Sequence, residues 1–142
     1  MTPDRMKEIH RQLIEALNNH SSEGIGGFFH DNYTVHEGYN NPDGTERYYT
    51  VSLAMLKKSI GKGIPGLPDK HQTVKMQIAE GDLVFTYCVA TATHSGPWCG
   101  VPATGRQLTY ENLYISRFEG GKIAEHWVIL DAFGMLRQIG AL

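Results

Sequence analysis

The chain has 142 residues, of which 41% are hydrophobic and 20% are charged, and its formal net charge at pH 7 is −2. That length has room for one domain, residues 1–142, with an apolar core of its own. The near-neutral charge offers no electrostatic reason to bind nucleic acid, and the longest apolar run, residues 127–130, is far too short to cross a bilayer. No basic segment precedes an apolar stretch near the first residue, so we expect a cytoplasmic globular protein that binds neither nucleic acid nor membranes.

Cysteine and histidine do not form a metal-binding pattern. Two cysteines, Cys88 and Cys99, are too few for a disulfide framework or a four-cysteine zinc site. The histidines lack the spacing of a helical zinc motif, and the pair His36 and Glu37 has no evident third ligand. Residues 61–66 have the letters G-x-G-x-x-G but contain a proline and open no helix. The sequence therefore predicts no metal and no cofactor.

The N-terminal part of the chain is predicted to be helical. Thr2 and Pro3 are typical of a helix start, with a hydroxyl N-cap followed by proline at the first helical position. Apolar residues then recur at helical spacing as far as Leu17, and residues 18–20 end the helix. A short second helix capped by Ser22 is expected to follow, although three glycines in this segment lower its helix propensity.

A segment rich in turn residues separates these helices from the main run of strands. Residues 33–37 have the composition of a short strand, and residues 40–44 are a cluster of turn formers. Thr50 is placed to cap a third helix whose apolar face ends at Ile60, and residues 61–68 are a loop rich in glycine and proline.

The second half of the chain has strand composition, rich in valine, isoleucine, threonine and aromatic residues. Hairpin turns are expected at residues 80–82 and 119–121. Helices followed by hairpin-linked strands indicate an α+β domain with an antiparallel sheet. The predicted strands cover residues 70–79, 83–94, 106–118 and 122–131.

Both faces of this sheet are predicted to be apolar. In residues 83–94 one face carries Phe85 and Tyr87, and the other carries Cys88 and Ala90. A sheet face in contact with water alternates more clearly with polar residues. We therefore expect one face to meet the helices and the other to meet a second copy of the chain in a homodimer.

Asp131 is the most informative ionisable residue. It ends the apolar run 127–130 and shares strand parity with Trp127. A carboxylate on an apolar face has a raised pKa, which suits general acid/base catalysis near neutral pH. The alternative is that Asp131 caps the helical segment 132–139. Spacing alone leaves both interpretations open.

Other candidate site residues have similarly open interpretations. Arg117 would stabilise an oxyanion if it faced into a cavity, whereas a strand arginine more often reaches solvent. His36 is either a second acid/base group or a histidine at the edge of the core, and Trp98 either covers a pocket or packs its own loop. The aromatic side chains predicted to shape an apolar, substrate-binding pocket are Tyr87, Trp98, Tyr110 and Trp127.

Several segments carry a family resemblance. The most specific is Gly-Lys-Ile-Ala-Glu-His-Trp at residues 121–127, followed by Asp131 and by Gly-Met-Leu-Arg-Gln-Ile-Gly at residues 134–140. This pattern resembles the C-terminal signature of the SnoaL-like polyketide cyclases. Segments that resemble other parts of the same family, so that nearly the whole chain is covered, are residues 31–36, 53–60, 94–96 and 100–106.

The resemblance implies the fold of nuclear transport factor 2, a cone-shaped, strongly curved antiparallel sheet wrapped by N-terminal helices around an apolar cavity. It also implies a homodimer packed through the sheet and acid/base chemistry without a cofactor. Asp131 falls on the aspartate that acts as general acid/base in these cyclases. Arg117 stands where they have a histidine, before Phe118. That replacement favours chemistry in which a fixed cation stabilises an enolate, carboxylate or alkoxide.

The sequence thus predicts a cofactor-independent cyclase or isomerase that acts on an apolar polyketide- or terpenoid-like intermediate. Its catalytic residues are expected to be Asp131, His36 and Arg117. One alternative is an epoxide hydrolase-like or dehydratase enzyme, with Glu37 or Glu111 as the second carboxylate. Another is a non-catalytic dimer that binds a small molecule.

Overall fold

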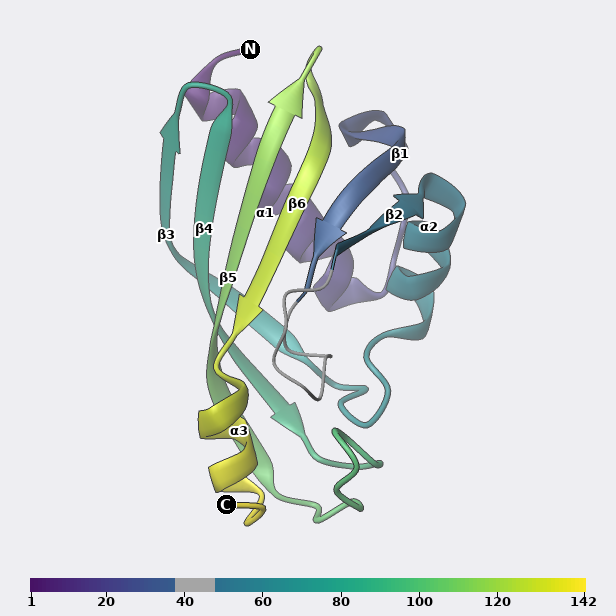
Figure 1. Ribbon diagram of the computed structural model, residues 1–142, viewed down its shortest axis with the longest axis vertical. Helices are drawn as coiled ribbons and strands as arrows, with labels where there is room; N and C mark the ends of the chain where they lie inside the picture. Colours follow the sequence, from purple (N-terminus) through teal and green to yellow (C-terminus); the bar gives the residue numbers. More distant parts are fainter. Residues whose placement is uncertain (38–47) are drawn as a thin grey trace.

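The computed structural model describes residues 1–37 and 48–142 (Figure 1). None of the helices in these two ranges is long and apolar enough to span a membrane. In chain order the elements are α1 (Pro3–Asn19), the 3-10 turn η1 (Gly26–Phe28), β1 (Phe29–His36), β2 (Tyr48–Ser52), α2 (Leu53–Lys62), β3 (His71–Glu80), β4 (Leu83–Thr93), β5 (Gln107–Glu119), β6 (Lys122–Leu130) and α3 (Ala132–Gln138).

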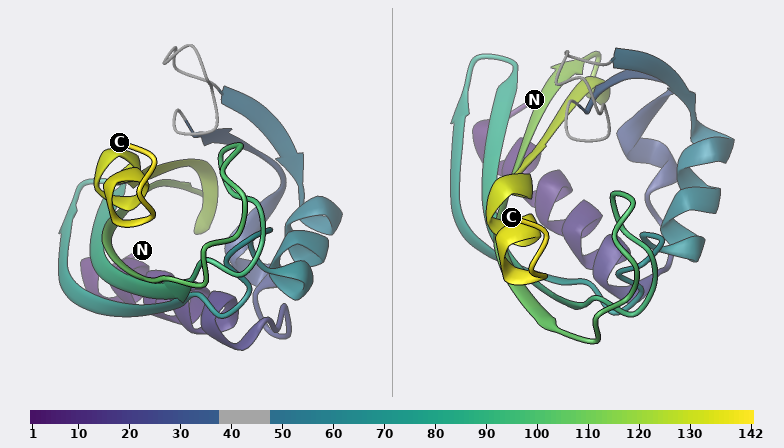
Figure 2. Two further views of the ribbon diagram at one scale, coloured as in Figure 1. Left: turned by 90° about the horizontal axis from the view of Figure 1, so that it is seen from below. Right: turned by 60° about the horizontal axis from the view of Figure 1, so that its bottom comes forward.

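The described strands form one sheet in the order β2-β1-β6-β5-β4-β3. Neighbours are antiparallel except β1 and β6, which run parallel with Val35 opposite His126. The α+β class is confirmed, but the sheet is mixed, because β1 reaches β6 from the N-terminal part of the chain and not through a hairpin. Figure 2 shows the sheet curving around the interior of the molecule, with α1 and α2 on the side of that interior opposite the sheet.

The two faces of the sheet differ in what covers them. We call the side that packs against α1 and α3 the helix face, and the opposite side the open face. Alternation along β4 places Val84 and Cys88 on the helix face, where both are fully buried. Phe85 and Tyr87 lie on the open face, where Phe85 is 36% exposed.

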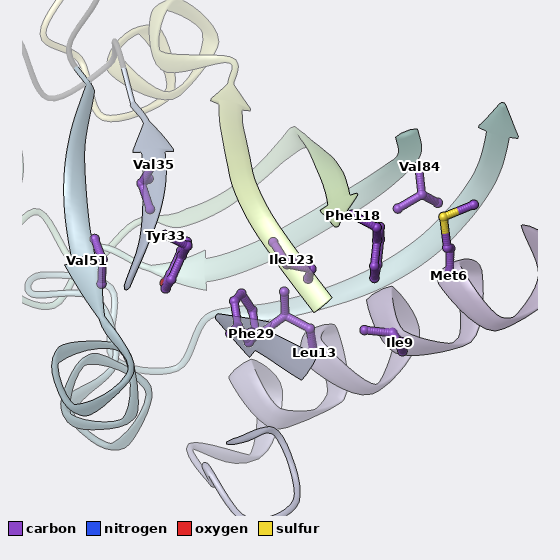
Figure 3. Packing of buried hydrophobic residues seen from close by; sticks show 10 residues of the cluster. All are labelled: Met6, Ile9, Leu13, Phe29, Tyr33, Val35, Val51, Val84, Phe118 and Ile123. Atoms are coloured by element: carbon purple, nitrogen blue, oxygen red, sulfur yellow. The ribbon is translucent and has the colours of Figure 1, made fainter. Parts of the chain in front are cut away.

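Helix α1 supplies the centre of the core. Its start is as predicted, since Thr2 Oγ1 accepts the N–H of Arg5 at 3.1 Å and proline stands at the first helical position. Met6, Ile9 and Leu13 project from one side and are each at most 3% exposed (Figure 3). Full burial of such a side chain contributes about 1.5–3 kcal/mol. They pack with Phe29, Tyr33, Val35, Val51, Val84, Phe118 and Ile123.

Two local predictions differ from the structure. Helix α2 begins after Ser52, whose Oγ accepts the N–H of Met55 at 3.2 Å, whereas Thr50 lies inside β2 because that segment pairs with β1. Between α1 and β1 only the short turn Gly26–Phe28 forms in place of a second helix, in keeping with the cost of glycine in helices. The turn predicted at residues 40–44 lies outside the described residues.

Gly66 holds the loop after α2 against the loop after β4. Its carbonyl accepts the N–H of Ser95 at 3.0 Å, its φ is +84°, and a Cβ there would lie 2.5 Å from the carbonyl oxygen of Pro97. We expect Gly66→Ala to lower the free energy of unfolding, measured with urea, by about 1–3 kcal/mol more than Gly100→Ala. Gly100 is the matched control because its φ is +77° but nothing lies within 4 Å of a Cβ built on it. Equal losses in the two variants would show that the close approach at Gly66 is unimportant.

Candidate functional site

The predicted site residues do not converge on one place. Tyr110 and Trp98 are buried on the helix face, whereas Asp131 is exposed at the junction of β6 and α3. The inward orientation on which the predicted role of Arg117 depends is not observed, because alternation along β5 turns Phe118 inward and Arg117 outward. The residues on the open face are His36, Tyr87, Arg117 and Trp127.

Asp131 is the N-cap of α3. Its Oδ1 accepts the N–H of Gly134 at 2.9 Å, and its own N–H donates to the carbonyl of Glu111 at 3.1 Å. A Cβ on Gly134 would collide with the Asp131 carboxylate, so glycine at that position leaves the space in which the carboxylate lies. The capping interpretation is therefore realised, and the same carboxylate remains accessible to solvent.

Tyr110 lies in an apolar cluster next to this junction. It is 3% exposed, and its hydroxyl forms no hydrogen bond with residues 1–37 or 48–142. Burial raises the pKa of this hydroxyl well above its usual range, so it stays protonated and can donate. The rest of the cluster comprises Leu67, Ala90, Ala92, Trp98, Leu108, Met135 and Ile139.

Lys70 brings a cation to the same region, and sequence reasoning did not single it out. Its Nζ lies 5.6 Å from the centre of the Tyr110 ring. It also lies 2.9 Å from the side-chain oxygen of Asn112 when the Asn112 amide is oriented so that its nitrogen donates to the carbonyl of Ile129 at 3.2 Å. Desolvation lowers the pKa of Lys70 to about 8, partly offset by Cys88 and Glu37. The ammonium form therefore still predominates at pH 7.

A line of buried polar side chains crosses the helix face from α1 to β6. His10 of α1 lies 2.6 Å from Thr86 Oγ1 through Nδ1 and 2.6 Å from Ser116 Oγ through Nε2. Ser116 Oγ is in turn 2.7 Å from Nδ1 of His126. The His126 ring stacks on Tyr114, with centroids 5.6 Å apart.

Both of these histidines are neutral at physiological pH. Desolvation lowers the pKa of His10 to about 3, with a smaller contribution from the nearby His126, and lowers that of His126 to about 4. The sequence did not reveal them as a pair, because 116 residues separate the two in the chain.

The open face carries an apolar row that crosses every described strand. Cross-strand register places one residue of each strand in this row, and the side chains of His36 and Trp127 stack with centroids 4.7 Å apart. A second, shorter row lies beside it and includes Ile129, which is 52% exposed. The first row comprises Ile78, Phe85, Ile115, Trp127, His36 and Tyr48, and the second Met76, Tyr87, Leu113 and Ile129.

A charged group lies at the edge of these rows. His36 Nε2 lies 2.8 Å from Glu125 Oε1, and Arg117 Nε donates to Glu125 Oε2 at 3.0 Å. Arg117 and His36 both lower the pKa of Glu125, the arginine by more. His36 and Arg117 are thus joined to each other through one carboxylate, on the opposite side of the sheet from Tyr110.

The carboxylates considered for an epoxide hydrolase are also placed by the structure. Glu111 accepts the Tyr87 hydroxyl on the open face at 2.8 Å, and Glu37 accepts the Tyr49 hydroxyl at 2.6 Å. Among residues 1–37 and 48–142, no three histidine, cysteine, aspartate or glutamate side chains are grouped as metal ligands would be.

Comparison with known proteins identifies the family. The sequence profile of the SnoaL-like polyketide cyclases matches residues 7–139, and the chain belongs to this family. It therefore has the fold of nuclear transport factor 2, which the resemblance of residues 121–140 implied.

Curated relatives of this chain are cyclases from Streptomyces. It is 26% identical over 137 residues to aklanonic acid methyl ester cyclase DnrD of Streptomyces peucetius, covering 94% of this chain and 89% of that protein. It is also 26% identical over 129 residues to nogalonic acid methyl ester cyclase of Streptomyces nogalater, covering 90% and 92%.

Solved structures agree over almost the whole chain. The structure of AclR from Streptomyces galilaeus superposes with a TM-score of 0.77 and 27% identity, covering 99% of this chain and 88% of that one. The structure of IdmH from Streptomyces antibioticus gives a TM-score of 0.71 and 32% identity, covering 94% and 97%.

Proposed function

We propose that this chain catalyses ring closure of a polyketide intermediate by proton transfer, with Asp131 as the general acid/base. Tyr110 carries the proposal, because it is a buried donor without a protein partner in the described residues and lies in an otherwise apolar cluster beside the Lys70 ammonium. Such surroundings suit a mostly apolar molecule that presents a carbonyl oxygen. The curated cyclases support ring closure as the type of reaction.

The proposed reaction conserves all atoms. Asp131 removes a proton from a carbon next to a carbonyl group, and the resulting enolate attacks a second carbonyl of the same molecule. A carbon–carbon bond forms, and the new alkoxide takes the proton back from Asp131. Tyr110 and Lys70 would bind the oxygens that gain negative charge, which is where fixed donors contribute most to catalysis.

The position of Asp131 supports this role, because α3 connects Asp131 to the apolar cluster that contains Tyr110. Asp131 is the N-cap of α3, and Met135 within this helix and Ile139 directly after it pack with Tyr110. We assign substrate contact to Tyr110 and Trp98.

The experiment that tests this function is incubation of the purified chain with aklanonic acid methyl ester and, separately, with nogalonic acid methyl ester. A product of unchanged mass with one new ring, seen by mass spectrometry and NMR, is the expected result. Gain of a water molecule would indicate a hydrolase, loss of one a dehydratase. Binding without conversion of either ester would favour the non-catalytic alternative.

We further propose that the open face is covered by a second copy of the chain. The two apolar rows give this face large exposed side chains, including Met76 and Ile78 at 57% each. A face of this kind in a soluble protein is typical of an interface. In this arrangement the side chains of Tyr87, Trp127, His36 and Arg117 contact the partner copy and not the substrate.

Ile129→Glu is expected to convert a dimer into a monomer. A two-fold interface would bury the new carboxylate twice, and unpaired charges are costly to desolvate. The dissociation constant of the dimer is therefore expected to rise at least about 100-fold. Analytical ultracentrifugation gives the mass. Phe133→Glu is the matched control, because Phe133 is 64% exposed and lies on α3, the helix whose Met135 packs against the helix face. A monomeric wild-type chain would contradict the proposal.

A further inference from the structure

A donor and an acceptor can be assigned to each of the buried hydrogen bonds that link α1 to His126. The line starts at Gln77, whose Nε2 donates to the carbonyl of Lys7 and to Thr86 Oγ1, both at 3.0 Å. The Gln77 Oε1 accepts from Arg11 Nη1 at 2.6 Å. A carbonyl can only accept and a guanidinium can only donate, so the orientation of the Gln77 amide is fixed.

Each following group then has one consistent role. Thr86 Oγ1 accepts from Gln77, and among the described residues Nδ1 of His10 is the acceptor within hydrogen-bond distance of this fully buried hydroxyl, so the hydroxyl proton is directed to Nδ1. A neutral imidazole with an unprotonated Nδ1 carries its proton on Nε2, so His10 donates to Ser116 Oγ. The Ser116 hydroxyl accordingly donates to Nδ1 of His126.

The end of the line is a free donor on His126. Because Nδ1 of His126 accepts, its proton is on Nε2, which points away from Ser116 on the other side of the ring. No residue in the described parts of the chain forms a hydrogen bond with this Nε2. The ring stacks on Tyr114, which lies on the same face of the sheet as Tyr110 and whose hydroxyl is 2.7 Å from Gln72 Oε1.

We propose that His126 presents a fixed, neutral Nε2–H donor to a carbonyl or enolate oxygen of the bound ligand, and that Ser116, His10, Thr86 and Gln77 are positioning residues that set its tautomer. This inference rests on the proposed function for the identity of the ligand. A neutral donor suits an enolate, because an imidazolium at the same place would transfer its proton to the enolate and end the reaction before ring closure. The lowered pKa of His126, about 4, agrees with a neutral ring.

The tautomer is tested by nitrogen NMR of the ¹⁵N-histidine-labelled chain, without any substrate. We expect His10 and His126 to give the pattern of neutral Nε2–H rings at pH 7. Ser116→Ala removes the donor to His126 and is expected to leave its ring as a mixture of tautomers. Ser95→Ala is the control, because that exposed hydroxyl donates to the carbonyl of Thr93 and is not part of the line. A wild-type His126 that carries its proton on Nδ1, or is charged at pH 7, would overturn the proposal.

The ligand contact is tested by adding aklanonic acid methyl ester to the same sample. We expect the Nε2 signal of His126 to shift on binding. In the turnover assay we expect Ser116→Ala to lower kcat about 10–100-fold with little change in KM, because the donor acts on charge that develops during the reaction. Full kcat in Ser116→Ala with an active wild-type chain would refute the role of His126 while the proposed function stands. If the wild-type chain binds the ester without converting it, the proposed function fails, and the His126 signal still decides the contact.

Discussion

Replacing Asp131 by asparagine is expected to reduce ring closure by about 10²–10⁴-fold and to leave the melting temperature unchanged. General acid/base groups contribute about that factor, and an amide cannot accept and return a proton at neutral pH. Asparagine is as good an N-cap as aspartate, and its side-chain oxygen can accept the Gly134 N–H that Asp131 Oδ1 accepts at 2.9 Å. The substitution therefore separates the two interpretations of this residue. Turnover and a thermal scan of the same preparation provide the measurement.

Asp131→Ala is the control for the contribution of the helix cap to stability. It removes both the acid/base group and the cap, so it is expected to lose activity and about 1 kcal/mol of stability. Wild-type turnover in Asp131→Asn would remove Asp131 from the mechanism and leave it as a helix cap.

Acidification is expected to unfold the protein because two buried histidines must then be protonated. His10 and His126 have folded-state pKa values of about 3 and about 4, below the ordinary value of 6.5. The unfolded chain binds protons more tightly, so their contribution to stability is fully present above pH 6.5. It is lost as the pH falls toward the folded-state values. Between these limits each histidine adds about 1.36 kcal/mol per pH unit to the slope of unfolding free energy against pH. Their combined effect is of the same order as the total stability of a domain, about 5–15 kcal/mol.

The measurement is urea unfolding followed by circular dichroism at several pH values between about 4.5 and 6. His10→Gln is expected to be less stable at pH 7, because it disturbs contacts to Thr86 and Ser116, but to show a slope shallower by nearly one proton. His71→Gln, at an exposed histidine, is the control and is expected to retain the wild-type slope. Identical slopes in all three proteins would show that the buried histidines are not linked to acid stability.

Local signals in the sequence were sufficient for most elements. The Thr2–Pro3 start and the apolar stripe through Leu13 predict α1, and the hairpin turns delimit β3 to β6. These features are set by neighbours along the chain, so a short window contains them. Asp131 was likewise found as both a helix cap and a family position.

The arrangement of the site could not be obtained in this way because of an irregularity in β6. The register shifts between Arg117 and Phe118, so Ile123 and His126 both lie on the helix face although they are three residues apart. Simple alternation from Ile123 would place His126 on the open face. Lys70 was missed for a related reason, since its partners Tyr110 and Asn112 come from a strand about 40 residues further along.

The parallel pairing of β1 with β6 has a consequence for the order in which the molecule assembles. Phe29 and Ile123 are partners across more than ninety residues of chain, whereas tight hairpins join β3 to β4 and β5 to β6, and residues 94–106 join β4 to β5. Closing so long a loop costs more entropy and is slower than forming hairpins. We therefore expect the meander of β3 to β6 to form first and β1 to dock onto it late. During synthesis on the ribosome, β1 must wait for its β6 neighbour until nearly the whole described chain has been made, and the pairing of Phe29 with Ile123 can form only then.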